Sequence, residues 1–462
     1  MTELTAALSA ADANLDDSLE RLFELLRIQS ISTDPAFAPE CRRAGQWLVD
    51  ELTSLGFEAS LRDTTGHPMV VGHHPGATPD APHYLFYGHY DVQPVDPLNL
   101  WIDPPFEPAI KEIAPGRKAI TGRGSSDDKG QLMTFVEACR AWKAASGSLP
   151  CRITILFEGE EESGSPSLVP FLREHAAILK ADLALVCDTS RFDEDTPAIT
   201  TRLRGLLGEE VTLHAASRDL HSGGYGGPAA NPLRVLARVL AGLHDEAGRV
   251  TLPGFYDGVS DLPPELAAQW QGLGFDAAEF LGRVGLSHPA GEAGRSALEM
   301  LWARPTCEIN GIRGGYTGAG FKTVLPAEAH AKVSFRLVGR QDPLAIREAF
   351  RAHVAGALPP DVRATFEGHG ASPAVEMETG HPAFEAARAA LSDEWPRPAA
   401  FIGAGGSIPI AGWFKEHLGL DAMLIGFGRD DDQLHSPNEK YDLKSFHKGM
   451  RSWARVLAAI AG

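Results

Sequence analysis

Cysteines and long apolar segments are both scarce in this sequence. The five cysteines are scattered and include no CxxC pair, a pattern typical of reduced cytosolic thiols and not of a disulfide framework or a thiolate metal site. No apolar run approaches the roughly 18 residues that a membrane-spanning helix requires. The first 17 residues carry four carboxylates and lack the basic and apolar segments of a signal peptide. We therefore expect a cytoplasmic protein.

Positive charge is the other deficit. The chain has 42 Lys and Arg residues against 61 Asp and Glu residues, which gives a formal net charge of -19. Nucleic acids and anionic membrane surfaces both attract basic faces, so neither is an expected partner. With 462 residues, 44% of them hydrophobic, the chain is expected to be a soluble globular protein of about two domains.

The most informative segment is the acidic stretch from Phe157 to Ser165, which holds the run Glu160-Glu161-Glu162. It directly follows an apolar, β-branched run, residues 151–156, that we expect to be a buried strand. Carboxylates crowded at a strand end repel one another, and burial favours their protonated forms. A bound metal cation is the usual way to keep such a cluster ionised. A solvated acidic loop is the alternative when the run is considered by itself.

A histidine and an aspartate follow a second expected strand, residues 83–89. His89 lies at the end of this aromatic and aliphatic run, and Asp91 is two residues further along. On an extended segment both side chains project to the same side, and a carboxylate next to a metal-bound imidazole commonly fixes the orientation of the ring. The alternative is a buried histidine with satisfied hydrogen bonds, followed by an aspartate in a turn.

Three more polar side chains occur at the ends of expected elements. Asp127 lies in a Gly- and Ser-rich stretch before a helix, where capping of that helix is the alternative role. Asp188 ends an apolar run that is typical of a buried strand, and His435 follows an expected strand at residues 422–428. Ligands of open α/β sheets gather where the strands end, so the polar groups from His89 to Asp188 are expected at one edge of the sheet. His435, considered by itself, is a loop histidine that indicates little.

The order of strands and helices predicts two domains. Residues 1–204 and 381–462 alternate strands with helices, which predicts an α/β domain whose mixed, mostly parallel sheet is covered by helices. In residues 205–380, glycine-rich loops separate strand and helix candidates in an order that suits an inserted α+β domain. The strands expected in this insert are residues 206–216 and 329–337, and the helices are residues 231–244 and 342–355.

The polar segments occur in the order seen in one family of hydrolases. They are His89-x-Asp91, Ser126-Asp127-Asp128-Lys129-Gly130, Glu161-Glu162-Ser163-Gly164, Asp188, Asp219-Leu220-His221-Ser222-Gly223 and His435-Ser436-x-Asn438-Glu439. Over nearly its whole length, the chain resembles the dinuclear-metal family of aminoacylases, acetylornithine deacetylase, succinyl-diaminopimelate desuccinylase, glutamate carboxypeptidases and dipeptidases. It most closely resembles the carnosine dipeptidase and cytosolic non-specific dipeptidase branch. The resemblance implies a catalytic domain formed by residues 1–204 and 381–462, and a lid and dimerisation domain at 205–380.

The resemblance also implies a site for two divalent ions, Zn²⁺ or Mn²⁺. Asp127 would bridge both ions. His89 and Asp188 would complete the shell of one ion. Glu162 and His435 would complete the shell of the other. Nitrogen and oxygen donors without a thiolate suit these metals, and two such ions about 3.5–4 Å apart can share a hydroxide and polarise a carbonyl oxygen together.

The same resemblance assigns catalytic roles. Glu161, next to a ligand, would be the general base that takes a proton from water and delivers it to the leaving amine. Asp91 would orient His89. His221, in the inserted domain, would reach into the site of the partner subunit and donate a hydrogen bond to the oxyanion, so that a homodimer is implied.

Substrate-binding residues are implied as well. Arg336, Thr323 and Ser407 would hold the C-terminal carboxylate of the substrate, for which an arginine fork is suited. His369 would be a further histidine on the substrate side. The chain departs from its branch at Ala404, where a Glu often precedes the Gly-Gly-Ser turn, and this departure puts strict specificity for a free α-amine in question.

Together these residues imply a metal-dependent hydrolase that cleaves the amide bond of dipeptides or small peptides. An N-acyl-amino-acid deacylase or a carboxypeptidase of the same family is the alternative. A catalytically silent binding protein on this fold is a more distant alternative. The presence of Glu161 and of every ligand position argues against a silent protein.

Overall fold

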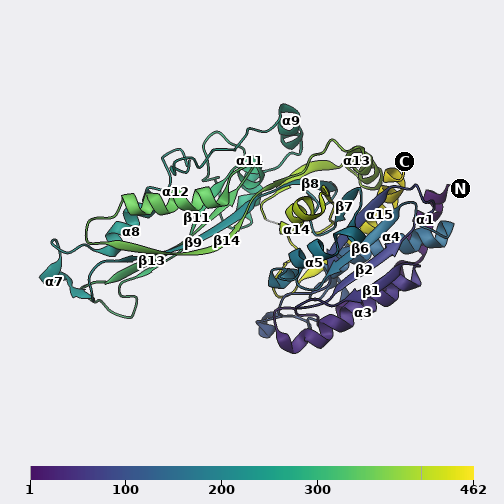
Figure 1. Ribbon diagram of the computed structural model, residues 1–462, viewed down its shortest axis with the longest axis horizontal. Helices are drawn as coiled ribbons and strands as arrows, with labels where there is room; N and C mark the ends of the chain where they lie inside the picture. Colours follow the sequence, from purple (N-terminus) through teal and green to yellow (C-terminus); the bar gives the residue numbers. More distant parts are fainter. Residues whose placement is uncertain (1, 407) are drawn as a thin grey trace. The chain divides into compact units, whose positions relative to one another are not determined.

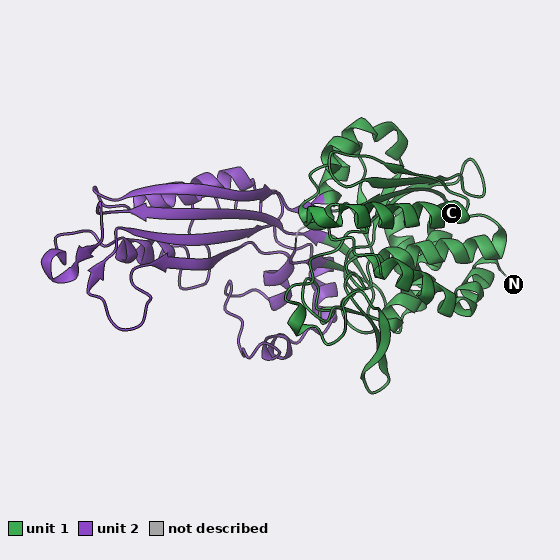
Figure 2. Ribbon diagram, turned by 90° about the horizontal axis from the view of Figure 1, so that it is seen from below, with its two compact units in different colours: residues 1–201, 377–402, 410–462 green, residues 202–376, 403–409 purple. Residues whose placement is uncertain are grey.

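The computed structural model describes residues 2–406 and 408–462, and Ser407, one of the predicted substrate contacts, lies outside the described residues. The chain divides into two compact units (Figure 2). Unit 1 comprises residues 1–201, 377–402 and 410–462, and unit 2 comprises residues 202–376 and 403–409. Separate clusters of buried apolar side chains form a core in each unit.

A mixed sheet covered by helices forms the centre of unit 1, as predicted (Figure 1). Its strands are β1 (Glu58–Arg62), β2 (Met69–His74), β3 (His83–His89), β6 (Arg152–Glu158), β7 (Leu183–Val186), β8 (Ala198–Leu203), β15 (Val375–Glu376, whose residues belong to unit 2), β16 (Ala400–Ala404) and β17 (Ala422–Leu424). The order is β1-β2-β6-β3-β7-β17-β8-β15, with β16 also paired to β8. The four strands from β6 to β17 pair in parallel, whereas the pairs β1–β2, β2–β6, β17–β8 and β8–β15 are antiparallel. Parallel pairing is thus confined to the centre of the sheet, which is mixed as predicted but not mostly parallel.

The central strands are nearly continuous apolar runs because the sheet is buried where they lie. From their second residue onward, β3 and β6 are fully buried, and so is all of β7, as is usual for parallel strands covered on both faces. The strand expected at 422–428 ends earlier, at Leu424. Beyond it, the N–H of Phe427 donates to the side chain of Gln131 and not to a neighbouring strand.

Helices and aromatic side chains complete the core of unit 1. The helices are α1 (Glu3–Ala13), α2 (Leu15–Leu26), α3 (Ala38–Ser54), α4 (Lys129–Ser146), α5 (Leu168–Glu174), α6 (Ala176–Leu179), α13 (Pro382–Glu394), α14 (Pro409–Trp413, which starts at the unit boundary) and α15 (Leu443–Ile460). Helix α4 packs on β3, and α15 packs on α4. Phe86 and Phe135 stack with 3.6 Å between ring centroids, and Trp453 meets both rings edge-on. None of the helices in the described part of the chain is long and apolar enough to cross a membrane.

A small second sheet in unit 1 has the order β18-β5-β4. It consists of β4 (Ala109–Ala114), β5 (Arg117–Thr121) and β18 (Lys440–Asp442). Short helical turns lie at Pro35–Phe37 (η1), Leu98–Leu100 (η2), Glu161–Ser163 (η3) and Phe414–Leu418 (η4). The antiparallel β5–β18 pair joins the segment just before residues 122–128 to the segment just after His435.

Unit 2 is an α+β unit with an antiparallel sheet of order β11-β13-β9-β14. These strands are β9 (Gly205–His214), β11 (Thr306–Gly314), β13 (Glu328–Leu337) and β14 (Arg363–Ser372). Buried and partly buried residues alternate along β9, because α8 (Pro232–Ala241) and α12 (Pro343–Gly356) cover one face (Figure 1). The smaller elements are β10 (Leu220–His221), β12 (Val324–Leu325), α7 (Ser222–Tyr225), α9 (Pro264–Gly272), α10 (Ala277–Gly282) and α11 (Ala297–Trp302).

A buried carboxylate at the end of α13 provides a test of how unit 1 is held together. Glu394 accepts hydrogen bonds from Lys448, Arg451 and Arg455 of α15. Burial opposes its charge, but the bonds from the two arginines lower the pKa of Glu394. Replacing it with Gln removes the negative charge and one of the two oxygens that accept hydrogen bonds from these cations. We therefore expect Glu394→Gln to reduce the free energy of unfolding at pH 7 by about 1–3 kcal/mol.

The difference between wild type and Glu394→Gln should depend on pH. Because the folded pKa of Glu394 is lowered, its contribution is present above the unfolded value and is lost as the pH falls through the folded one. Urea unfolding at pH 7 and at pH 3 measures this difference. The matched control is Glu385→Gln, an exposed partner of Arg388 on the same helix, with an expected change within about 0.5 kcal/mol. Equal losses of unfolding free energy in Glu394→Gln and Glu385→Gln would contradict the stabilising role assigned to Glu394.

Candidate active site

Three of the predicted site segments lie at or just beyond the carboxyl ends of neighbouring parallel strands. His89 is the last residue of β3 and is paired with Glu158, the last residue of β6. Asp188 lies two residues beyond β7, which pairs in parallel with β3. Because these strands run in the same direction, their carboxyl ends share one edge of the sheet. The acidic run after β6 therefore reaches the same edge as His89 and Asp188.

Asp127 joins two histidines from distant parts of the chain. It lies in the loop before α4, and its Oδ1 is 3.0 Å from Nε2 of His89. Its Oδ2 is 3.0 Å from Nε2 of His435, in the loop between β17 and β18. The same nitrogen of His435 is 3.2 Å from Oε2 of Glu162, and Nε2 of His89 is 3.9 Å from Oδ2 of Asp188. The structure thus brings together all five side chains predicted to bind metal.

These side chains form two groups of donors that share Asp127. One group is His89, Asp127 and Asp188, and the other is Asp127, Glu162 and His435. Within each group the ligand atoms all lie within 4.8 Å of one another. Imidazole nitrogens with carboxylate oxygens suit divalent ions such as Zn²⁺ or Mn²⁺, so each group fits one ion. The role of each residue as a ligand stays a prediction.

The carboxylates of the site perturb one another. Burial, followed by the charge of Asp127, raises the pKa of Asp188 to about 7. Burial likewise raises the pKa of Glu161 to about 7, and the charges of Asp188 and Asp91 add to the rise. In Asp127, burial opposes the charge, but hydrogen bonds from His435 and His89 lower its pKa. A cation would favour the ionised form of every one of these carboxylates, which is a second reason that the donor set fits divalent ions.

Asp91 is buried and contacts both His89 and the acidic run at Glu161 and Glu162. Its Oδ1 accepts a hydrogen bond from the backbone N–H of Glu161 at 3.2 Å, and its Oδ2 accepts one from Glu162 at 3.0 Å. The same Oδ1 lies 3.4 Å from Nδ1 of His89. Asp91 therefore lies where a residue that orients His89 is needed. It also fixes the backbone of the predicted base and of a predicted ligand.

The sequence-based predictions missed two side chains that hold predicted ligands. Gln93 donates from Nε2 to Oε2 of Glu162 at 2.7 Å. Its place two residues after Asp91, on the same side of an extended segment, is the signal that points to it. Asp128 accepts a hydrogen bond from the backbone N–H of His89 at 3.1 Å. Asp128 lies next to a predicted ligand, but its sequence context does not distinguish a supporting carboxylate from a binding one.

His221 and Thr323 belong to a glycine-rich part of unit 2. His221 ends β10, and its ring Nδ1 accepts a hydrogen bond from the backbone N–H of Gly223 at 2.9 Å. In the neutral ring, the hydrogen atom must then be on Nε2. Thr323 precedes β12, and its carbonyl accepts a hydrogen bond from the N–H of Ser222. His221 and Thr323 are therefore joined through adjacent backbone, and the His221 ring is held as a donor.

Arg336 and His369 lie on the two strands that flank β9 in unit 2. Arg336 is opposite Leu206, and His369 is opposite Gly208. The ring of His369 is 3.8 Å from Oε2 of Glu210, a partner that the sequence-based prediction did not include. Burial and the charge of Arg336 together lower the pKa of Arg204 to about 10. Two guanidinium groups thus create a positive region in unit 2.

Comparisons with known proteins agree with this geometry. The sequence pattern of peptidase family M20/M25/M40 matches residues 85–459. The Cys-Gly metallodipeptidase dug1 of Schizosaccharomyces pombe is 29% identical, with 97% of each chain covered. The Beta-Ala-His dipeptidase of Homo sapiens is 28% identical, covering 97% of this chain and 91% of the human one.

Solved structures show the same similarity. The di-peptidase Dug1p of Saccharomyces cerevisiae has a TM-score of 0.81 at 28% identity, covering 100% of this chain and 99% of that one. The M20 family metallo-carboxypeptidase Sso-CP2 of Sulfolobus solfataricus has a TM-score of 0.80 at 30% identity, covering 96% and 99%. The family expected from the six motifs is confirmed: the protein is an enzyme that belongs to peptidase family M20/M25/M40.

Proposed function

We propose that the protein is a metal-dependent dipeptidase that hydrolyses the amide bond of a dipeptide or small peptide. The observation that carries the proposal is the position of Asp127, whose two carboxylate oxygens each lie 3.0 Å from a different imidazole. A single carboxylate shared by two donor groups would keep two ions close together, as a two-ion hydrolytic site needs. Dipeptidases are prominent among the similar proteins.

The ligand set follows from the two donor groups. Asp127 would contribute its carboxylate to both ion sites, which would hold Zn²⁺ or Mn²⁺. His89 and Asp188 bind one ion, and Glu162 and His435 bind the other. When bound, the two ions supply Lewis acidity that lowers the pKa of water and polarises the scissile carbonyl.

Glu161 acts as the general base. It is adjacent to Glu162 in sequence but belongs to neither group of three donors, so its carboxylate is available for proton transfer. Its backbone is fixed by Asp91, which limits the positions that the carboxylate can take. Glu161 takes a proton from the attacking water and delivers it to the leaving amine.

Replacement of Glu161 by Gln separates this role from ligation. We expect Glu161→Gln to lower kcat by about 10²–10⁴-fold while the protein retains the wild-type amount of bound metal. Turnover of a dipeptide and elemental analysis of the same sample provide the two measurements. Parallel loss of metal and activity would show that Glu161 is a ligand and not the base.

Unit 2 acts as a lid and dimerisation domain, corresponding to the insert expected at residues 205–380. His221 of each chain completes the site of the partner subunit by donating to the oxyanion. The hydrogen bond from Gly223 to Nδ1 supports this role, because it leaves Nε2 as the donor. A monomer would lack this donor.

Mixing two inactive variants tests the shared site. Each chain of the His221→Ala variant keeps Glu161, and each chain of the Glu161→Gln variant keeps His221. After subunit exchange, half of the dimers contain one complete site, so about a quarter of the wild-type activity should return. Lack of any recovery, when mass spectrometry shows that mixed dimers have formed, would exclude a site shared in this way.

Arg336, Thr323 and Ser407 bind the C-terminal carboxylate of the substrate, and His369 lies on the substrate side. The positive region around Arg336 and Arg204 supports carboxylate binding. Ala404, in place of an acidic residue, removes one possible partner of a free α-amine. It therefore favours the alternative function, an N-acyl-amino-acid deacylase or a carboxypeptidase.

A substrate panel distinguishes these functions. Cys-Gly, β-Ala-His and other dipeptides are compared with N-acetyl and N-succinyl amino acids, with Zn²⁺ and Mn²⁺ supplied in turn. We expect kcat/KM for the best dipeptide to exceed that of every acyl-amino acid by at least about 10-fold, or 1.4 kcal/mol. A preference for acyl-amino acids would assign the deacylase function. No turnover of any substrate would assign a binding protein.

The state of the thiols supports a cytoplasmic location. All five cysteines are free and buried. Burial raises the pKa of Cys41, Cys151 and Cys307 to about 12, so these thiols are unreactive. Unpaired thiols are typical of proteins of the reducing cytoplasm.

A further inference from the structure

Two predicted ligands of unit 1 lie in loops and not at the ends of strands. The loops are the Asp127 loop (residues 122–128) and the His435 loop (residues 429–439). The side chain of His89 is fully buried, whereas 57% of the side-chain surface of His435 is exposed. The backbone of His435 is also left-handed, with φ 56°, a conformation that is unfavourable for a residue with a Cβ atom. Packing alone therefore does not fix His435, and its position depends on how the loop is held.

Glu439 makes the first link between the two loops. Its carboxylate is fully buried, and Oε1 accepts hydrogen bonds from the backbone N–H groups of Ser126 (2.9 Å) and Asp127 (3.0 Å). Oε2 accepts hydrogen bonds from the N–H of Gly124 (2.9 Å) and from Nη1 of Arg123 (2.8 Å). A side chain from the end of the His435 loop thus fixes the backbone at the residue that both ions would share.

Asp432 makes the second link, through a side chain instead of the backbone. It is fully buried, and its Oδ2 accepts hydrogen bonds from Oγ of Ser126 and from the N–H of Arg429, both at 2.8 Å. Its Oδ1 lies 2.7 Å from Nζ of Lys440. Asp432 therefore links the beginning of the His435 loop to Lys440, the residue that follows the loop. It also links both to Ser126.

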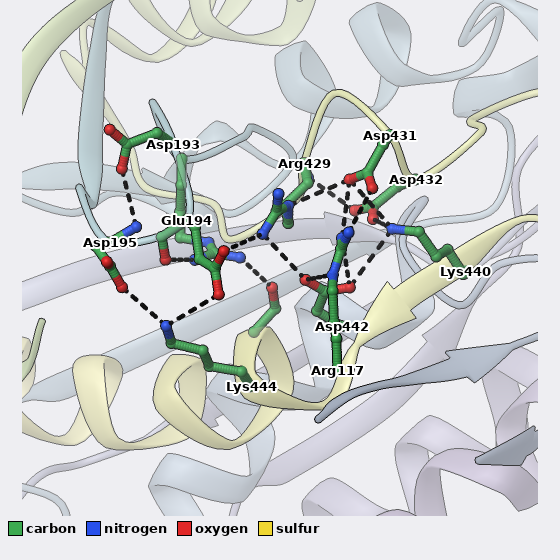
Figure 3. Close-up of polar contacts among 12 residues, drawn as sticks. Arg117, Asp193, Glu194, Asp195, Arg429, Asp431, Asp432, Lys440, Asp442 and Lys444 are labelled. Carbon is green, nitrogen blue, oxygen red and sulfur yellow. Dashed lines mark hydrogen bonds and ion pairs between the residues drawn. The ribbon is translucent and has the colours of Figure 1, made fainter. Parts of the chain in front are cut away.

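A charged cluster surrounds these contacts (Figure 3). Arg117 pairs with Asp431 at 2.8 Å and with Asp442 at 2.9 Å. Arg429 pairs with the same two carboxylates, at 3.2 and 3.3 Å. Because Asp442 lies in β18 and Arg429 begins the His435 loop, the cluster holds the two ends of the loop together. A network of this kind restricts a loop more than one exposed ion pair does.

We propose that Asp432 and Glu439 are positioning residues that affect different numbers of ion sites. Asp432 supports only the ion that His435 binds, whereas Glu439 supports both ions. This inference rests on the two-ion site proposed above. Without Asp432, the His435 loop loses its anchor while Glu439 still holds Asp127. Without Glu439, the backbone of the shared ligand is released, so both donor groups are disturbed. Partners that orient metal ligands commonly change metal affinity by about 10–100-fold.

Titration of the metal-free full-length protein with Mn²⁺ alone tests this difference. Calorimetry gives the two dissociation constants, and elemental analysis after dialysis at a fixed free Mn²⁺ concentration gives the number of bound ions. We expect Asp432→Asn to raise one dissociation constant by about 10–100-fold and to leave the other within about 3-fold. Glu439→Gln should raise both constants. Ser126→Ala removes only the hydroxyl group that bonds to Asp432. It should raise the same dissociation constant as Asp432→Asn does, by a smaller factor.

A double variant identifies which ion is affected. In a His435→Ala chain, the remaining ion is the one of the His89 group, which Asp432 does not support. Adding Asp432→Asn should therefore leave the affinity for that ion unchanged. Glu394→Gln is the matched control, because it also neutralises a buried, ion-paired carboxylate and should bind Mn²⁺ as wild type does. Thermal unfolding of each metal-free variant separates a loss of fold from a loss of metal.

Three results would overturn the inference. They are wild-type Mn²⁺ binding in both Asp432→Asn and Ser126→Ala, equal weakening of both ions by Asp432→Asn, and further weakening of the remaining ion in the double variant. A wild-type protein that binds neither Mn²⁺ nor Zn²⁺ would instead overturn the proposed two-ion function. The two failures are therefore distinguishable.

Discussion

The position of one carboxylate between two imidazoles is the constraint on which the site depends. Asp127 must have His89 near one oxygen and His435 near the other, although these histidines are separated by more than three hundred residues. The carboxyl groups of Glu161, Glu162 and Asp188 lie around Asp127. Burial raises the pKa of all three, and the charge of Asp127 adds to the rise. Crowding like charges in a buried place costs free energy, so the surrounding fold has to hold the arrangement in place.

The fold meets this constraint in two different ways. Strand ends place His89, Asp188 and the acidic run, because parallel strands buried on both faces have little freedom to shift. The Asp127 and His435 loops have no such support, and buried carboxylates of Glu439 and Asp432 hold them instead. The rigid half of the site is thus built by apolar packing and the other half by hydrogen bonds. Since packing and polar contacts respond differently to substitution, the two halves can be perturbed separately.

The sequence predicts the first half of the site better than the second. Apolar runs reveal the central strands, and a polar residue just beyond such a run, as at His89 or Asp188, is visible without a structure. That Asp127 and His435 meet at these strands was implied only by the family resemblance, because spacing along the chain does not report contacts between distant loops. Asp432 was missed for the same reason: the sequence does not show whether a single polar residue in a loop supports a ligand or faces solvent.

The sequence likewise predicts only part of the sheet in unit 1. Alternating elements predicted a mixed sheet covered by helices, which is confirmed, and an α+β insert. They did not predict that parallel pairing stops at the four central strands, or that β17, from near the end of the chain, lies between β7 and β8. Strand order depends on which apolar faces pack together, and many orders bury similar areas. Beyond Leu424, where β17 ends, the N–H of Phe427 donates to a distant partner, the side chain of Gln131, which the sequence pattern did not predict.

The distribution of cations explains how a chain with a net charge of -19 keeps its site open to metal. In the described part of the chain, the ion pairs of Asp127, Glu162 and Asp188 are all with histidines. Lysine or arginine at that distance would neutralise the carboxylates permanently and compete with divalent ions. The arginines and lysines lie one layer further out instead, where Arg123 pairs with Glu439 and Lys440 with Asp432. Fixed cations thus stabilise the supporting carboxylates. The carboxylates proposed to bind metal pair only with imidazoles in the described part of the chain, and an imidazole can release a proton when it binds an ion.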